Sequence, residues 1–161
     1  MSLAGARDRG MSFEPPATIV DHAHHYAVRV YYEDTDAGGV VYHANYLRFA
    51  ERARTEALRD LGVPHAELVS RHNLMFMVRR IKLDYLGPAR LDDSLVVVTR
   101  PMAVRAASID LRQSFVRRES PEGGAATREL AVLEVGLACV NLADNRPMRI
   151  PARWRDALQG L

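Results

Sequence analysis

The segment from Tyr31 to Gly62, YYEDTDAGGVVYHANYLRFAERARTEALRDLG, decides the fold and indicates the chemistry of this chain. Acidic residues follow its aromatic start, and the pair Gly38-Gly39 follows the acids. From Asn45 onward, apolar residues recur at three- and four-residue steps, which predicts an amphipathic helix that ends at Leu61. A turn that carries carboxylates into a helix start places an acid or a base beside free backbone N–H groups. We therefore predict chemistry on a carbonyl compound.

The composition is that of one ordinary globular domain. The 161 residues are 48% hydrophobic and 26% charged, and the formal net charge is +2. The chain has no run of basic residues, so nothing favours binding to nucleic acid. Because no apolar stretch approaches ~18 residues, we expect no membrane span. One cysteine, Cys139, allows no disulfide within the chain, which favours a reducing, cytoplasmic location.

The N-terminal segment differs from the rest. Residues 1–22 are small, charged and proline-bearing, without the apolar core of a signal peptide, and we predict a flexible tail there. Residues 23–161 then form the folded domain.

Strand-forming runs surround the predicted helix. One run, Tyr26–Tyr32, precedes it, and four follow at Leu74–Tyr85, Leu95–Arg100, Ala107–Arg117 and Arg128–Leu142. The predicted hairpin turn is Ser120–Gly124, a further extended piece is Met148–Ile150, and a terminal helical turn is Pro151–Leu158. One helix with consecutive antiparallel strands predicts an α+β layer pair.

Two motifs resemble a known family. The run DAGGVVYHANY, Asp36 to Tyr46, with Glu51 after it, resembles hot-dog-fold acyl-CoA thioesterases of the 4-hydroxybenzoyl-CoA thioesterase type. Within that type it is similar to the branch associated with the bacterial Tol-Pal envelope system. The run IKLDYLGPAR, Ile81 to Arg90, is similar to the strand and turn after that family's helix. The resemblance covers about Ala23 to Pro151, and Asp92-Asp93 departs from the family's usual Gly-Asp turn.

The resemblance implies a fold and an assembly. A curved antiparallel sheet wraps around one long central helix, and two protomers join their sheets edge to edge with active sites at the interface. Dimers pair into homotetramers. The implied substrate is a thioester of CoA or of acyl carrier protein, and hydrolysis needs no metal and no other cofactor.

The resemblance also assigns the catalytic residues. Asp36 matches the family's general base or nucleophile, and the backbone N–H of His43 matches the group that polarises the thioester carbonyl. In the Tol-Pal-like branch the histidine side chain is implicated as well. From the residues alone, Asp36 could instead cap the turn, and the His43 side chain could be incidental. Glu33 and Asp34 are rival acids.

Six further residues are predicted to contact substrate: Gly39, Val40, Tyr42, Asn45, Tyr46 and Glu51. Each has a plainer interpretation. Asn45 is a good helix N-cap, the two tyrosines are core candidates, and Glu51 can pair with a neighbouring arginine on the helix surface. The histidines at positions 22, 24 and 25 lack the partner spacing of a metal site.

Two other functions stay open beside hydrolysis. One is a non-catalytic protein that binds acyl thioesters or an envelope complex. The other is a hydratase or dehydratase, whose sites pair a His with an acid on different elements. The chain has no G-x-S-x-G nucleophile elbow, and the Asp36–His43 run favours the thioesterase. Acyl chain length and the choice between aryl and alkyl groups are not predicted.

Overall fold

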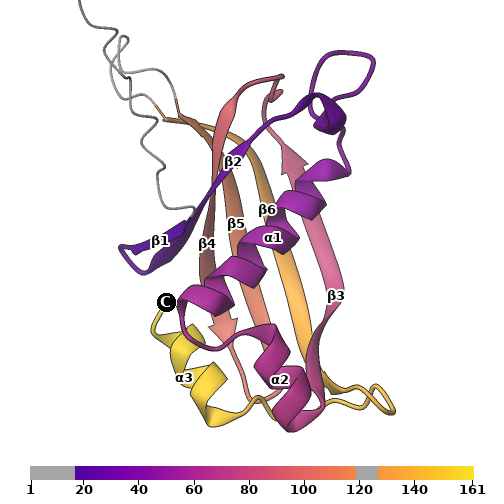
Figure 1. The fold of residues 1–161 in the computed structure, drawn as a ribbon, viewed down its shortest axis with the longest axis vertical. Coiled ribbons are helices and arrows are strands. Elements are labelled where there is room, and N and C mark those ends of the chain that lie inside the picture. The colour runs from indigo at the N-terminus through magenta and orange to yellow at the C-terminus, as the bar shows by residue number, and fades with distance from the viewer. Residues whose placement is uncertain (1–16, 119–126) are drawn as a thin grey trace, which may run out of the picture.

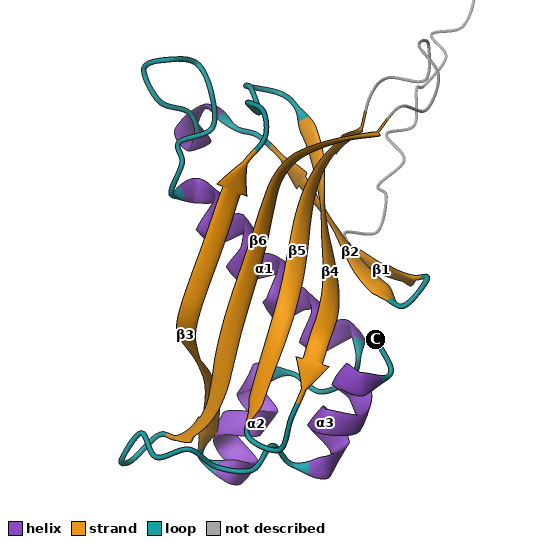
Figure 2. Ribbon diagram, turned by 180° about the vertical axis from the view of Figure 1, so that it is seen from behind, coloured by secondary structure: helices purple, strands orange, loops and turns teal. Residues whose placement is uncertain are grey.

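The structure is a computed structural model that describes residues 17–118 and 127–161. One antiparallel sheet of six strands has the order β1-β2-β4-β5-β6-β3, and helix α1 lies diagonally across one face of it (Figures 1 and 2). The strands are β1 Ala17–Val20, β2 Ala23–Arg29, β3 Leu74–Tyr85, β4 Ser94–Val104, β5 Ser108–Arg118 and β6 Thr127–Asn141. The helices are η1 Tyr32–Asp34, α1 Asn45–Asp60, α2 His65–His72 and α3 Ala152–Gln159. The predicted α+β class is confirmed.

The core lies between α1 and the inner face of the sheet. Phe49, Ala50, Ala53 and Ala57 form the buried stripe of α1, at the helical spacing that the sequence shows. They pack on buried residues of the central strands, including Leu95, Val97, Leu111, Phe115, Leu133 and Val135. Small alanine side chains let the helix approach the sheet closely, so the position of α1 follows from its sequence.

Helix α2 was not predicted from the sequence. It follows directly after the Gly62–Pro64 stop signal, and among its residues only Leu68 is buried. Such a short helix carries too little apolar periodicity to be recognised, and its packing against the sheet stabilises it. It ends at Asn73, which takes the left-handed conformation with φ 54°.

The prediction of a flexible tail over residues 1–22 is wrong for the C-terminal end of that segment. Residues 17–20 form β1, which pairs with β2, while residues 1–16 lie outside the described part of the chain. Asp21 and His22 connect the two strands with φ values of 49° and 56°. Two positive φ values are the signature of a type I′ hairpin turn, which usually carries Asn-Gly, so the Asp-His pair gave no signal.

Three other boundaries differ from prediction. Strand β2 ends at Arg29, because Tyr32 enters η1, where the Asp34 carboxylate accepts the Tyr31 N–H at 2.9 Å. Strand β4 runs on past Arg100 through a register shift at Pro101. Residues 148–150 form no strand, although Pro147 makes an isolated bridge to Val140. The predicted hairpin turn at Ser120–Gly124 lies outside the described residues.

Cys139 lies in the core, as the sequence predicts. Its side chain is fully buried on β6, and burial raises the pKa of its thiol to about 11. The thiol therefore stays protonated in the folded protein near neutral pH.

We expect Cys139 to make the stability of the fold pH-dependent in alkaline solution. Its folded pKa lies above its ordinary value, so its contribution is complete below pH 9.0 and is lost as the pH rises toward about 11. The free energy of unfolding should fall by up to ~1.4 kcal/mol per pH unit in that window. Urea titrations of wild type and Cys139→Ala test this, because the fall in stability between pH 9.0 and about 11 should be steeper in wild type than in the variant.

Candidate active site

A tight loop joins η1 to α1 and holds most of the predicted site residues. Thr35 and Val41 form an isolated bridge, and the Asp36 N–H donates to the Val40 carbonyl at 2.9 Å. The Gly39 N–H donates back to the Asp36 carbonyl at 3.0 Å. Gly39 has φ +73°, a left-handed conformation that glycine adopts without a steric cost. The glycine at this position is therefore required by the turn.

The Asp36 carboxylate lies against the backbone of this turn. Its Oδ1 accepts the Gly38 N–H at 2.8 Å, and a Cβ added at Gly38 would come within 3.1 Å of the same oxygen. Gly38 thus leaves room for the carboxylate to fold onto the loop. The side chain is exposed and keeps further acceptor positions, since an ionised carboxylate has about four. Asp36 is placed to meet a ligand that approaches from solvent.

The His43 N–H has a defined direction at the start of α1. The Asn45 N–H donates to the Tyr42 carbonyl at 2.8 Å, which orients the peptide between Tyr42 and His43. Carbonyl and N–H of a trans peptide point in opposite directions, so the His43 N–H points away from the helix. Within the described residues it donates to no backbone carbonyl. It is an available donor at the positive end of a helix dipole.

The hydroxyl of Tyr85, on β3, orients the peptide between His43 and Ala44. It donates to the His43 carbonyl at 2.8 Å, which fixes the Ala44 N–H in turn. The His43 ring is exposed and lies beside the Tyr42 ring, with centroids 4.4 Å apart. Two neighbouring N–H groups at the helix start are therefore oriented by hydrogen bonds from other residues.

Asn45 and Tyr46 have structural roles. Asn45 is the first residue of α1 and not its N-cap, which is Ala44, so the predicted capping is wrong. Its Nδ2 donates to the Asp34 carbonyl at 2.9 Å and joins the end of η1 to the helix. Tyr46 is buried with its ring edge-on to Phe115, and burial raises the pKa of its hydroxyl.

A pocket beside the loop joins the two sequence motifs. It is open to solvent and has a volume of about 370 Å³, and its lining residues are Val40, Val41, His43, Tyr46, Tyr85, Leu86, Gly87 and Pro88. We call it the loop pocket. The Val41 N–H donates to the Ala89 carbonyl at 2.8 Å, which ties the loop to the turn after β3. The second motif therefore builds one wall of the pocket.

Glu51 lies in a different pocket from His43. It lines a small pocket between α1, α2, α3 and the strands, with a cavity volume of about 40 Å³, which we call the inner pocket. Its carboxylate pairs with Arg54. The structure therefore shows the pairing with a neighbouring arginine that the sequence offered as the alternative to substrate contact. The structure gives Glu51 no contact with Asp36 or His43.

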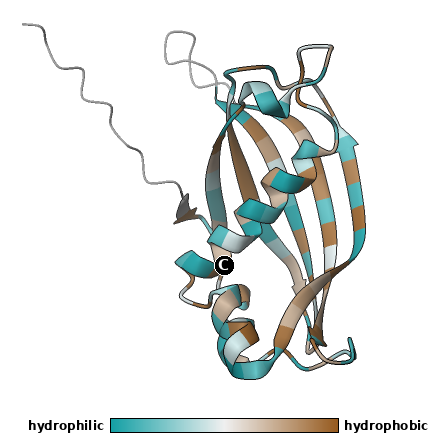
Figure 3. Ribbon diagram, turned by 45° about the vertical axis from the view of Figure 1, so that its right-hand side comes forward, coloured by the Kyte–Doolittle hydropathy of each residue, from teal (hydrophilic) through white to brown (hydrophobic). Residues whose placement is uncertain are grey.

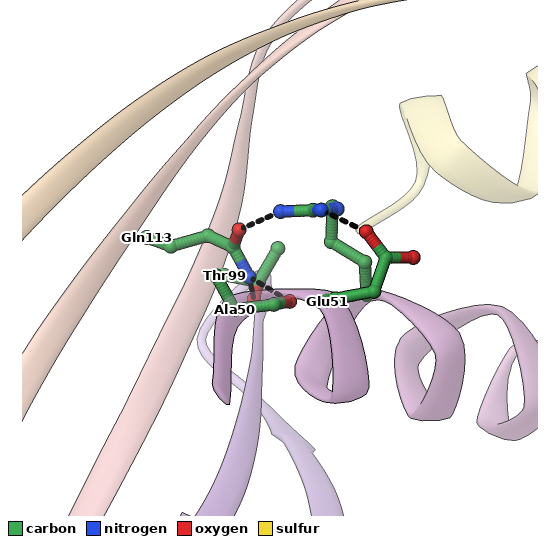
Figure 4. Close-up of polar contacts among 5 residues, drawn as sticks. Ala50, Glu51, Thr99 and Gln113 are labelled. Atoms are coloured by element: carbon green, nitrogen blue, oxygen red, sulfur yellow. Dashed lines mark hydrogen bonds and ion pairs between the residues drawn. The ribbon is translucent and has the colours of Figure 1, made fainter. Parts of the chain in front are cut away.

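A buried polar network lies beside the inner pocket, and Glu51, Arg54 and Thr99 of this network line the pocket (Figure 4). Arg54 donates to Gln113 Oε1 at 2.8 Å and also pairs with Glu51. Gln113 Nε2 donates to the Ala50 carbonyl and to Thr99 Oγ1, both at 3.0 Å. Gln113 is fully buried, and Arg54 and Thr99 nearly so. The network links α1 to β4 and β5 across the core.

The family of the chain follows from comparison with known proteins. A family model described as the thioesterase-like superfamily matches residues 30–158. An acyl-CoA thioesterase named YbgC from Haemophilus influenzae is 41% identical over 143 residues, which cover 89% of this chain and 99% of that protein. The chain belongs to the thioesterase-like superfamily. The resemblance drawn from Asp36 to Tyr46 is thereby confirmed.

Solved structures agree with the fold of this thioesterase-family chain. A probable thioesterase from Bartonella henselae is 36% identical with a TM-score of 0.71, covering 80% of this chain and 99% of that one. A 4-hydroxybenzoyl CoA thioesterase, 18% identical, has a TM-score of 0.77 and covers 85% and 99%. The hot-dog fold that the sequence predicts is confirmed.

The sequence patterns did not predict the buried polar network that includes Arg54 and Gln113. Gln113 stands between Leu111 and Phe115, on the side of β5 whose other residues are apolar. Arg54 follows Ala50 by four residues, next to the buried stripe of α1. A polar residue on an apolar face is the signal that could have found both, because a buried polar group needs partners.

The described residues hold no cluster of three or more His, Cys, Asp and Glu side chains that could bind a metal ion. Of the N-terminal histidines, His24 is buried and lies 2.9 Å from the Asp60 carboxylate through its Nε2. No described helix is both long and apolar enough to span a membrane.

Proposed function

We propose that this chain hydrolyses acyl-CoA thioesters, with Asp36 and the His43 N–H acting on the thioester carbonyl. Acyl-CoA and water give a carboxylic acid and CoA. The observation that carries the proposal is one loop that presents an exposed carboxylate and an oriented, available N–H. The name of the Haemophilus influenzae relative supports the substrate class.

Either of two routes fits Asp36. As a base it takes a proton from water, and the hydroxide adds to the carbonyl carbon. As a nucleophile it adds directly, expels the CoA thiolate and forms an anhydride that water then opens. Both routes develop negative charge on the carbonyl oxygen. The His43 N–H and the dipole of α1 stabilise that oxyanion.

Hydrolysis of a panel of acyl-CoA substrates, followed by the release of free CoA thiol, tests the proposal. Turnover should be well above that of the uncatalysed reaction. Saturable binding of acyl-CoA without thiol release would instead identify a thioester-binding protein. The same panel presented on acyl carrier protein decides which carrier the site accepts.

Replacing His43 with alanine should separate its backbone from its side chain. The variant keeps the N–H, so the rate should change little if that donor alone matters. We expect kcat/KM to fall ~10²-fold, because an imidazole at the rim of the loop pocket fits an acid, base or substrate contact. A variant that keeps more than half of the wild-type kcat/KM would remove the side chain from the mechanism.

We also infer a homo-oligomer that forms through β3. This strand is an edge of the sheet, and Val78, Ile81 and Tyr85 on it are exposed. Unpaired edges favour pairing with another chain. Light scattering at micromolar concentration should give at least twice the 18.0 kDa chain mass, and a tetramer fits the pairing of two dimers. A mass near that of one chain would contradict this inference.

Cellular context extends the proposal. A cytoplasmic location stays a prediction that comes from the single cysteine. A link to the Tol-Pal system stays a prediction that comes from the family resemblance. Co-purification of the tagged chain with envelope proteins tests that link.

A further inference from the structure

The end of β3 lies beside the first turn of α1, and Tyr85 joins these two elements (Figures 1 and 3). Tyr85 is the last residue of β3, and its hydroxyl donates to the His43 carbonyl at 2.8 Å. Both residues line the loop pocket. A side chain that lies 42 residues later in the chain therefore contacts the backbone of the catalytic loop.

The core determines where the Tyr85 hydroxyl points, although half of this side chain is exposed. Its ring lies edge-on to the buried Tyr46 ring, with centroids 5.5 Å apart and an interplanar angle of 77°. Tyr46 in turn packs edge-on against the buried Phe115 ring, at 5.2 Å between centroids. Aromatic pairs prefer this edge-to-face arrangement. The Tyr85 ring is thus supported from the core of the sheet.

A hydrogen bond to the His43 carbonyl also acts on the Ala44 N–H, because the two groups belong to one planar peptide. In a trans peptide they point in opposite directions, so a donor on the oxygen fixes the direction of the N–H. Such a donor also polarises the peptide and strengthens its N–H as a donor. Within the part of the chain that the structure describes, the Ala44 N–H donates to no backbone carbonyl. It is therefore available to a ligand.

The Ala44 N–H lies in the same turn as the His43 N–H. The Asn45 N–H donates to the Tyr42 carbonyl at 2.8 Å and closes this turn, in which Ala44 has the helical angles φ −75° and ψ −18°. Successive N–H groups at a helix start are unpaired and point away from the helix together. An oxygen atom that accepts the His43 N–H therefore lies within reach of the Ala44 N–H.

We propose that the Ala44 N–H is a second donor to the oxyanion and that Tyr85 is the positioning residue for it. The inference rests on the proposed hydrolysis. When water or Asp36 adds to the carbonyl carbon, the electron pair of the C=O π bond moves onto the oxygen, where both N–H groups stabilise it. When the C=O bond forms again, the C–S bond breaks and the CoA thiolate leaves. Tyr85 transfers no proton in these steps and acts only through the His43–Ala44 peptide.

The variant Tyr85→Phe tests the positioning, because it removes the hydroxyl and keeps the ring. Its kcat should fall about tenfold, a part of the loss that follows removal of an oxyanion donor, while KM changes by less than about twofold. The control Tyr26→Phe removes a hydroxyl from β2, which three strands separate from β3 in the sheet, and should leave both constants unchanged. An unchanged kcat in Tyr85→Phe, or a rise in KM alone, would overturn the proposal.

The variant Ala44→Pro removes the second donor itself. Proline has no N–H, and its φ of about −65° is close to the −75° of Ala44. The kcat should fall ~10²-fold, and thermal unfolding checks the fold, since proline restricts the residue before it. In the Ala44→Pro protein, Tyr85→Phe should lower kcat by less than about twofold further, because the group that Tyr85 positions is already absent. Losses that multiply in the double variant would overturn the link between Tyr85 and Ala44.

Infrared spectroscopy tests the contact without hydrolysis and without Ala44→Pro. The probe is the acyl-CoA of the panel that the Asp36→Asn protein binds most tightly, labelled with ¹³C at the thioester carbonyl. Hydrogen bonds to the carbonyl oxygen lower its stretching frequency, so the shift on binding should be smaller when Tyr85→Phe is added to Asp36→Asn. Equal shifts in both proteins, with hydrolysis by wild type, would reject this inference and keep the thioesterase. A shift that depends on Tyr85, without hydrolysis by wild type, would do the reverse.

Discussion

Replacing Asp36 with asparagine should lower kcat for acyl-CoA hydrolysis by ~10²–10⁴-fold, the usual contribution of a general base. Asparagine neither takes a proton from water nor attacks the carbonyl, so both proposed routes stop. The fold should survive, because the asparagine Oδ1 can accept the same Gly38 N–H and asparagine tolerates turns. Release of free CoA thiol from the best substrate measures the loss, and thermal unfolding checks the fold.

Glu33→Gln is the matched control for this experiment. Glu33 is an exposed acid three residues earlier, and the same loss of one carboxylate there should leave kcat within about twofold of wild type. If Asp36→Asn retained near-wild-type turnover, or if Glu33→Gln removed it, Asp36 would lose the assigned role. The loss for Asp36→Asn should also exceed that for His43→Ala, since the latter keeps the backbone donor.

Replacing Gln113 with methionine should lower the free energy of unfolding by about 2–4 kcal/mol. The buried Arg54 guanidinium loses an acceptor, and Thr99 Oγ1 and the Ala50 carbonyl each lose a donor. Methionine has a similar length, so the cost comes from unpaired polar groups rather than from a cavity. Urea denaturation followed by circular dichroism measures the change.

The double variant Arg54→Met with Gln113→Met tests whether unpaired polar groups cause this loss of stability. Removing both partners leaves less unpaired charge in the core, so the double variant should be less destabilised than the sum of the single changes. Arg59→Met breaks a solvent-exposed ion pair with Glu56 and should cost less than about 1 kcal/mol. A Gln113→Met effect as small as that of Arg59→Met would show that the network contributes little to stability.

Local patterns in the sequence were sufficient to predict α1, most of the strands, the glycine turn and the burial of Cys139. Each of these depends on neighbours within a few residues: an apolar stripe every three or four positions, alternation along a strand, or a glycine pair with one positive φ. The predicted catalytic loop was recognised in the same way, from a contiguous motif between Asp36 and Tyr46.

The tertiary structure alone decided the features that depend on distant parts of the chain. Arg54 and Gln113 are 59 residues apart and meet only because α1 crosses β5, while Tyr85 reaches His43 across 42 residues. Because Glu51 and His43 belong to one sequence motif, both were predicted to lie in one site. The helix instead places Glu51 at the inner pocket. Strand β1 and helix α2 likewise form by packing and pairing with the sheet. Local propensity is weak in such short segments, so the contacts that stabilise them cannot be read from their own residues.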